Sequence, residues 1–250
     1  MDDPPQNIYN PDFVEKLFSQ MSGTYDRMNT ITSFGFSVHW RRQCAAALHL
    51  QPAMKVVDLM TGMGESWPFV LNKIGREGEL VALDFCPEMI HFAEQQKERF
   101  PGFSVSILQE NALQSSIPDQ YADAVISTFG LKTFSPEQLD QLAAEVWRIL
   151  KPGGTFAMVE VSKPGFWALR YPYLFYLKKV IPKLGKLFLG NPESYRMLGV
   201  YTELFENSRQ AQKTFERAGF EVQYLRFFAG CATGIYGKKH ARFPNALSKL

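Results

Sequence analysis

The sequence predicts an α/β fold built on a mostly parallel sheet, and three observations lead to this prediction. From residue 54 onward, short runs rich in β-branched and other apolar residues alternate with longer stretches of helical spacing. The last two apolar runs are joined by Ala229-Gly230, a short link that suits a hairpin. The 250 residues are 46% hydrophobic, enough for the core of one α/β domain with an insertion. We therefore expect a single domain, 1–250, whose βαβ units form a sheet buried on both faces, with one antiparallel strand at its end.

The expected elements follow one another in a regular order. The region 11–50 is rich in helix formers, and Gln51-Pro52 stops it. Seven apolar runs are typical of strands, five for the parallel sheet and two for the hairpin: 54–60, 79–85, 103–109, 122–128, 155–161, 220–228 and 231–239. Helices are expected between them at 66–75, 87–100 and 135–150. Pro87 suits a first helical turn, Ser135 suits an N-cap before Pro136, and 150–154 (Leu-Lys-Pro-Gly-Gly) reads as a turn.

Three segments stand apart from this alternation. Residues 1–50 are interpreted as an N-terminal helical cap. Residues 162–215, of mostly helical character, are interpreted as a lid inserted between the fifth strand and the hairpin. Residues 240–250, which include Pro244, read as a loose tail.

The overall composition argues against several classes of protein. A net charge of +2 is too small to indicate a dedicated nucleic-acid binder. The three cysteines, Cys44, Cys86 and Cys231, are far apart and lack CxxC spacing, which favours a reducing compartment without a disulfide framework or a zinc site. The acidic, proline-rich start is unlike a secretory signal, and no run approaches the roughly 20 apolar residues of a membrane span. We expect a cytoplasmic protein.

The segment from Asp58 to Glu65 has the composition of a ligand-binding turn after the first strand. Gly62 and Gly64 allow a tight turn and a close approach of a ligand to the backbone. Trp67 stands where a dinucleotide fingerprint has its third glycine, and the Gly-Lys-Ser/Thr ending of a phosphate loop is absent. The two acids would repel a pyrophosphate and suit a cation such as the ammonium of an amino acid. Taken alone, the segment is equally compatible with a plain turn.

Three further strand ends add to this hypothesis, because ligands of open parallel sheets bind beyond the carboxyl ends of the strands. Asp84 stands where an acid can accept both hydroxyls of a ribose, although it also reads as the start of a helix. Together with the glycine turn it favours a cationic, ribose-bearing cofactor without phosphate, and S-adenosylmethionine has these properties. Asn111 and Ala112 would contact adenine, or form an ordinary turn. Thr128 and the backbone of Phe129-Gly130 would face the methyl-transfer centre.

Two long stretches, residues 25–42 (YDRMNTITSFGFSVHWRR) and residues 148–164 (RILKPGGTFAMVEVSKP), stand out from the rest of the chain. The first resembles the N-terminal signature of the UbiE family of ubiquinone/menaquinone C-methyltransferases, and the second resembles the second signature of that family almost throughout. The segments 128–133 (TFGLKT) and 194–199 (SYRMLG) also resemble the family. In colinear order, the resemblance runs from about Phe18 to Lys239.

The resemblance implies a Rossmann-like class I methyltransferase with a seven-stranded, mostly parallel sheet and an antiparallel last strand. It implies methyl transfer from S-adenosylmethionine to a ring carbon of a prenylated hydroquinone. Carried over by position, the cofactor-binding residues are Tyr25, Asp58, Gly62, Met63, Gly64, Asp84, Phe85, Asn111, Ala112 and Thr128.

Two departures from the family pattern concern the loop and the acceptor. Gly62-Met63-Gly64-Glu65 stands where the family commonly has Gly-Thr-Gly-Asp, which loses a hydroxyl and keeps the acid. Lys132-Thr133 replaces an Arg-Asn pair that is linked with the quinone head. Lysine is a point charge and arginine a bidentate fork, so the exchange is not neutral for an oxygen-bearing ring.

A methyl transfer to carbon needs alignment, and a base that removes a phenolic proton would raise the electron density of the ring. The candidates are Lys132, Tyr25, His39 and Tyr195. His39, beside Trp40, is more typical of a packing residue. Lys132 has the most suitable position, as an electrostatic clamp on a phenolate or, if burial favours its neutral form, as a base.

The residues 163–190 are basic, aromatic and amphipathic, with six basic residues and no acid. Such a segment suits a peripheral contact with an anionic membrane that holds a lipidic substrate. A lid whose apolar face packs on the sheet and whose lysines are solvated is the open alternative. We expect a hydrophobic small-molecule acceptor and no nucleic-acid partner, and we keep a homodimer as a candidate assembly.

The leading hypothesis is a methyltransferase that C-methylates a hydrophobic, prenylated hydroquinone-like or polyketide-like aromatic acceptor. The Lys132-Thr133 departure motivates a rival that makes a specialised metabolite by O- or N-methylation, or that uses the bound sulfonium without methyl transfer. A second rival, of another class, is a non-catalytic membrane-associated binding protein with the same fold.

Overall fold

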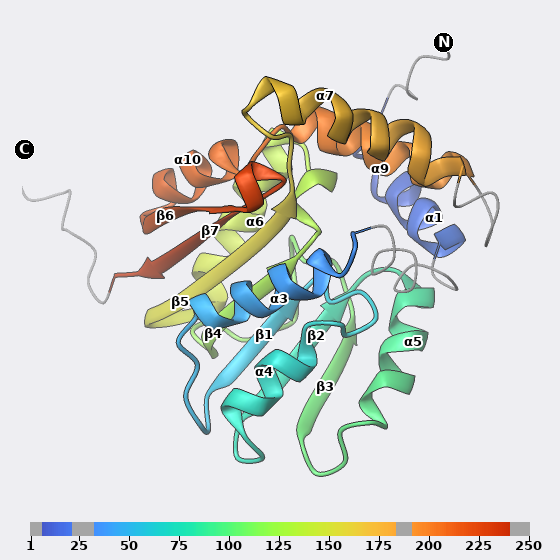
Figure 1. Cartoon of the computed structure of the whole chain (residues 1–250). Helices are drawn as coiled ribbons and strands as arrows, with labels where there is room; N and C mark the ends of the chain where they lie inside the picture. Colours follow the sequence, from blue (N-terminus) through green and yellow to red (C-terminus); the bar gives the residue numbers. More distant parts are fainter. Residues whose placement is uncertain (1–6, 22–32, 184–191, 241–250) are drawn as a thin grey trace, which may run out of the picture.

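Seven strands form one sheet in the computed structural model, which describes residues 7–21, 33–183 and 192–240 (Figure 1). The strands are β1 (Lys55–Leu59), β2 (Glu79–Asp84), β3 (Ser104–Gln109), β4 (Ala122–Thr128), β5 (Leu150–Val161), β6 (Phe220–Phe227) and β7 (Ala232–Lys239). Their order is β3-β2-β1-β4-β5-β7-β6, and neighbours among the first five are parallel. β7 is antiparallel to both β5 and β6. The expected fold class, with its antiparallel last strand, is confirmed.

Helices cover both faces of the sheet. The described α-helices are α1 (Pro11–Met21), α3 (Phe36–Ala47), α4 (Trp67–Ile74), α5 (Pro87–Lys97), α6 (Pro136–Ile149), α7 (Trp167–Phe175), α9 (Pro192–Phe205) and α10 (Arg209–Arg217). Side chains of α3, α4 and α5 pack on one face, and those of α6 and α10 pack on the other. Neighbouring strand residues serve opposite faces, as Val56 and Val57 do, which is why the strands read as continuous apolar runs.

The structure differs from the expected elements in two details. The segment 150–154, expected to be a turn, belongs to β5, and Leu150 pairs with Ala122 before a register shift. Gly153, at φ 82°, gives the strand the bend that allows this irregularity. The hairpin adds to the sheet through β7, so β6 is the edge strand and the antiparallel strand lies one position inside it.

The start of α6 shows why one expected boundary is accurate. The Ser135 hydroxyl accepts from the Gln138 N–H, and the Gln138 side chain accepts from the Ser135 N–H, which is a capping box. The Gln138 amide also donates to the Tyr9 carbonyl at 3.1 Å and so ties the N-terminal segment to this end of the sheet.

A third group of helices lies beyond the carboxyl ends of the parallel strands (Figure 1). α1, α9 and the π-helical turn η3 (Tyr176–Val180) share a cluster that includes Leu17, Met89 and Tyr201. The helices of 1–50 therefore divide, with α1 in this group and α3 on the face of the sheet. The insertion divides likewise, because α10 packs against the sheet. Within the described ranges, no helix is both long and apolar enough to cross a membrane.

Candidate functional site

Two cavities lie beyond the carboxyl ends of the parallel strands, and Phe129 lines both of them. The first cavity is bordered by the residues that follow β1, β2, β3 and β4 and by α1. The second cavity is bordered by α3, α7, η3 and α9. Their shared wall is the place where two bound molecules would meet.

The turn after β1 is held from beneath by a chain of hydrogen bonds. The Trp67 indole N–H donates to the Thr61 hydroxyl at 2.8 Å, and that hydroxyl donates to Asp58 at 2.7 Å. Gly64, at φ 84°, lies against Trp67, whose ring would be only 2.7 Å from an added Cβ. Gly64 is thus needed for packing under the turn, and of the two expected glycines only Gly62 lines the first cavity. The tryptophan in place of a third glycine is a structural support of the turn.

Asp84 joins the turns that follow β1 and β2. One carboxylate oxygen accepts from the Gly62 N–H at 2.9 Å and the other from the Cys86 N–H at 3.0 Å. Burial raises the pKa of Asp84 to about 6, although these two backbone bonds oppose the shift. Asp84 lines the first cavity, as a ribose-binding acid must.

Asp58 lies behind the turn and outside the cavity lining. It is 1% exposed, and its Oδ1 has no hydrogen-bond partner among the described residues. Burial raises the pKa of Asp58 to about 7. Two buried carboxyl groups with raised pKa values would be returned to their ionised form by a nearby cation. The first cavity therefore fits a cationic, ribose-bearing ligand such as S-adenosylmethionine.

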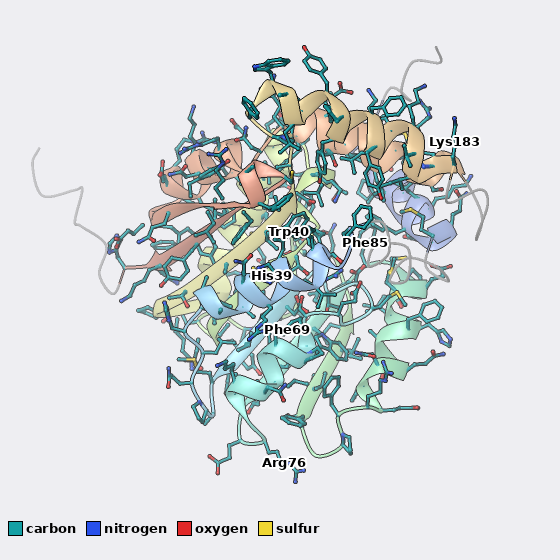
Figure 2. All side chains as sticks on the ribbon, in the orientation of Figure 1. His39, Trp40, Phe69, Arg76, Phe85 and Lys183 are labelled. Carbon is teal, nitrogen blue, oxygen red and sulfur yellow. The ribbon has the colours of Figure 1, made fainter. Side chains whose placement is uncertain are left out.

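The far wall of the first cavity has a polar and an apolar part. Asn111 accepts from the Leu113 N–H at 2.9 Å, and its amide N–H groups have no partner among the described residues. Ala112, Leu113 and Met89 line the same end. Phe85 is half-buried and points into the space between the sheet and the helices beyond it (Figure 2). A flat base with polar edges fits between these groups.

An ion pair that was not among the expected site residues closes the cavity beside the glycine turn. Arg41 on α3 donates to Glu65 at 3.0 Å, and the arginine is 2% exposed. Its guanidinium lies 4.8 Å from the centre of the Phe129 ring. Arg41 therefore balances the charge of Glu65, one of the two acids that were expected to suit a cationic ligand. The sequence shows the Trp-Arg-Arg motif that contains Arg41, but it does not show that Arg41 pairs with Glu65, 24 residues further along the chain.

The remaining expected residues fall in four different places. Thr128 lines the first cavity, and its hydroxyl is 2.9 Å from that of Ser66. Met63 lies outside both cavities and packs with the cluster beyond the sheet. His39 is exposed on α3 and lines neither cavity. Tyr25 and the side chain of Tyr195 lie outside the described residues.

Phe129 owes its position between the cavities to an unusual backbone conformation. Its φ is 67°, and its N–H donates to the Val159 carbonyl at 2.8 Å. Gly130 follows, where an added Cβ would be 2.5 Å from the sulfur of Met60. Strain of this kind in a non-glycine residue is frequent at functional sites.

The second cavity has a mostly apolar lining that includes a few hydroxyl-bearing residues, among them Ser37, Tyr173 and Thr202. Among the described residues that line it, Lys132 alone carries a charge. Its ammonium is 2.7 Å from the carboxylate of Glu160, and the two side chains are 5% and 0% exposed. Glu160 also accepts from the N–H groups of Lys132 and Val161, at 3.2 and 2.7 Å. The pair holds the lysine as a fixed cation, which supports the role of a clamp over that of a base.

Glu160 is a second residue that was not expected in the site. The sequence signal that could have identified Glu160 is an acid within the apolar run 155–161, because a buried carboxylate needs a partner. No group of three His, Cys, Asp or Glu that could hold a metal occurs in the part of the chain that the structure describes.

The sequence is similar to known methyltransferases along almost its full length. A profile described as the ubiE/COQ5 methyltransferase family matches residues 6–239. The demethylmenaquinone methyltransferase of Lactiplantibacillus plantarum is 34% identical over 232 residues, 92% of this chain and 97% of that protein. The protein of the same name from Listeria monocytogenes is 30% identical over 227 residues, 90% of this chain and 95% of its own.

Solved structures share the fold at lower identity. A SAM dependent methyltransferase from Aquifex aeolicus superposes with a TM-score of 0.53 at 22% identity, covering 76% of this chain and 84% of its own. A proposed S-adenosyl-L-methionine-dependent methyltransferase from Methanococcus maripaludis gives 0.60 at 16% identity, covering 98% and 99%.

Proposed function

This chain belongs to the ubiE/COQ5 methyltransferase family and is an S-adenosylmethionine-dependent methyltransferase, and from its two cavities we propose that it methylates a ring carbon of a hydrophobic hydroquinone. The observation that carries the proposal is the second cavity, a mostly apolar space in which the described lining has one charged residue, the buried Lys132. The relatives named demethylmenaquinone methyltransferase support a naphthoquinol with a prenyl chain as the acceptor.

In this proposal the first cavity holds the cofactor. Asp84 accepts the ribose hydroxyls, Asn111 and Ala112 contact the adenine, and Phe85 covers it. Gly62 offers its backbone to the amino-acid part, Asp58 acts on the ammonium from behind Thr61, and Thr128 lies toward the sulfonium. Tyr25 stays a proposed neighbour of the sulfonium from the family resemblance, as do Met63 and Gly64 as members of the loop.

The second cavity would hold the acceptor with its ring beside Lys132. Bound S-adenosylmethionine supplies an electrophilic methyl group on a sulfonium. Lys132, held by Glu160, stabilises a phenolate oxygen of the ring and so raises the nucleophilicity of the neighbouring carbon. Phe129 and Trp40 exclude water from the meeting point, and the lid helices bury the prenyl chain. Tyr25 and Tyr195 remain the candidate bases, since His39 lines neither cavity.

The experiment is an incubation of the protein with methyl-labelled donor and a panel of prenylated naphthoquinols, benzoquinols and simple phenols. We expect label on a ring carbon, with the naphthoquinol as the best acceptor. Label found only on oxygen or nitrogen would refute C-methylation. Calorimetry with S-adenosylmethionine, run in parallel, reads the cofactor site independently of the acceptor.

The rival that methylates oxygen or nitrogen of a specialised metabolite keeps one supporting observation, the Lys132-Thr133 departure from the family pattern. It predicts that polar phenols are better acceptors than prenylated quinols in the same panel. The homodimer also stays a proposal, and the mass of the protein in solution by light scattering tests it.

A further inference from the structure

The helical segment formed by α7 and η3 has two faces with different surroundings. Leu169, Tyr173, Leu177 and Ile181, here called the inner stripe, all line the second cavity. Trp167, Tyr171, Phe175, Lys179 and Lys183, here called the outer stripe, are all exposed. Both stripes repeat every four residues, and they are offset by two residues, about 200° around a helix. The segment therefore separates the cavity from the solvent.

The outer stripe is apolar where a soluble surface is usually polar. Trp167, Tyr171 and Phe175 are 69%, 70% and 63% exposed, and none of the α7 residues is buried. A helix that is apolar on both faces normally has a partner on each. The inner face has the cavity, and nothing in the described ranges covers the outer one. Adjoining exposed aromatic residues of this kind mark an interaction surface.

The second half of the outer stripe is basic. Lys179 and Lys183 have no ion-pair partner among the described residues, in contrast to Lys178, which pairs with Glu203. Residues 162–191 contain six basic side chains and no acid. Figure 2 shows Lys183 pointing away from the protein. A partner that covers this face must therefore carry negative charge and also offer an apolar interior.

We propose that the outer stripe is a docking surface for an anionic phospholipid bilayer, with α7 and η3 lying in the plane of the interface. Trp and Tyr side chains have an apolar body and a polar tip, which suits the boundary between headgroups and acyl chains. Lysines on the same stripe reach the anionic headgroups. This pattern favours a lipid surface over an acidic protein, whose interface would deplete lysine.

The docking would place the mouth of the second cavity at the membrane. Phe34 and Phe228 line this cavity and are also 79% and 56% exposed, so they mark its opening. Phe34 stacks on Tyr176 with ring centres 6.0 Å apart, next to the docking segment. A lipid-soluble acceptor could then pass from the bilayer past these rings. This step rests on the proposed function, whereas the docking itself does not depend on it.

The test uses the full chain and vesicles of neutral or mixed anionic phospholipids. Trp167 is the reporter, because Trp40 and Trp67 are buried and Trp147 is half-buried. We expect co-sedimentation with anionic vesicles that weakens at high salt, and quenching of tryptophan emission by brominated lipids. The double variant Lys179→Gln/Lys183→Gln should bind about 25-fold more weakly, since each lysine near an anionic surface contributes about fivefold.

Two further variants make the result specific. The control Lys73→Gln/Arg76→Gln removes the same charge from exposed positions, and Arg76 lies at the opposite end of the molecule from Lys183 (Figure 2). Vesicle binding by this control should stay within about twofold of the wild type, because charges far from the membrane are screened. Trp167→Ser/Tyr171→Ser/Phe175→Ser should lose most vesicle binding. The control pair and the triple variant should both retain turnover with a short-chain, water-soluble quinol. This assay tests the proposed function separately from the docking.

Three outcomes would overturn the docking. The first is a wild-type protein that does not sediment with anionic vesicles at low salt. The second is equal loss in the control pair Lys73→Gln/Arg76→Gln. The third is Trp167 emission that changes with protein concentration and not with lipid, which would assign the outer stripe to a second copy of the chain.

Discussion

The first and second cavities share Phe129 but are built from different parts of the fold. The first is framed by short turns at the ends of four neighbouring strands, so its polar groups are positioned by the sheet itself. The second is framed by helices from both ends of the chain, α3 at one end and α7 and α9 at the other. The sheet thus holds the part of the site common to the fold, and the helices hold the part that selects an acceptor.

The largest effect is expected where the first cavity depends on packing beneath it. Gly64→Ala adds a Cβ at 2.7 Å from the Trp67 ring in a backbone with φ 84°. We expect a loss of about 4 kcal/mol in the free energy of unfolding, from left-handed strain together with overpacking. Denaturant unfolding measures it. Gly153→Ala is the matched control, with φ 82° and no atom within 4 Å of the added Cβ, and it should cost about 1.5 kcal/mol. Equal losses would show that Trp67 does not support the turn.

A change confined to the second cavity should affect turnover and leave cofactor binding intact. Lys132→Met/Glu160→Gln removes the buried pair together, because the single change would strand a buried carboxylate. We expect turnover with a quinol to fall about 100-fold, as for the loss of one group that stabilises developing charge. The Kd for S-adenosylmethionine, measured by calorimetry, should change less than about threefold, because the cofactor is expected in the other cavity.

The control for this change is Lys151→Met/Asp123→Asn, which removes an ion pair at the amino ends of the strands. Lys132→Arg keeps the cation and should recover most of the turnover. A double variant with unchanged turnover would remove the lysine from the reaction.

Asp84→Asn is the corresponding change in the first cavity. An amide can accept from only one of the two backbone N–H groups that Asp84 now binds, and it loses the charge offered to the ribose. We expect the cofactor Kd to rise about 30-fold, in line with hydrogen bonds to a charged group. Asp123→Asn, which also removes a carboxylate that accepts a backbone N–H, should leave the Kd unchanged. The idea fails if the two variants bind the cofactor equally well.

The smallest expected effect is a pH dependence of cofactor binding. Burial raises the pKa of Asp84 to about 6 and that of Asp58 to about 7, and a bound cation favours the ionised forms. Affinity should therefore rise about tenfold as the pH increases from 5.5 to 8, with proton release on binding near pH 6.5. Calorimetry in buffers of different ionisation enthalpy measures both quantities.

The ligand-free protein should show the opposite trend in stability. Because both folded-state pKa values lie above the usual value of 3.8, the contribution of these two groups is fully present below about pH 4 and is lost as the pH rises through 6 and 7. Thermal unfolding with and without S-adenosylmethionine checks this sign. A ligand-induced rise in Tm that shrinks between pH 6 and 8 would contradict the assignment.

The same contrast explains what could be predicted from the sequence. Gly62, Asp84, Asn111, Ala112 and Thr128 all line the first cavity, because the rule that ligands lie beyond parallel strand ends needs only the strand positions. Periodicity likewise located all seven strands. The turn expected at 150–154 was wrong, because this segment belongs to β5, where Gly153 has a positive φ.

Partners across the fold could not be predicted in this way. Arg41 balances Glu65, and Glu160 holds Lys132, yet each pair comes from elements whose approach only packing decides. The packing of Trp67 against Gly64 also had no signal in the sequence. The second cavity draws on helices more than a hundred residues apart, so its shape has no local signal.

In the proposed function, donor and acceptor meet at Phe129, each in its own cavity. The most direct measurement is a crystal structure with S-adenosylhomocysteine and a short-chain naphthoquinol bound together. We expect adenine beside Asn111, ribose on Asp84, the quinol ring beside Lys132, and the sulfur facing a ring carbon at Phe129. A quinol bound away from Lys132, or a cofactor bound outside the first cavity, would contradict it.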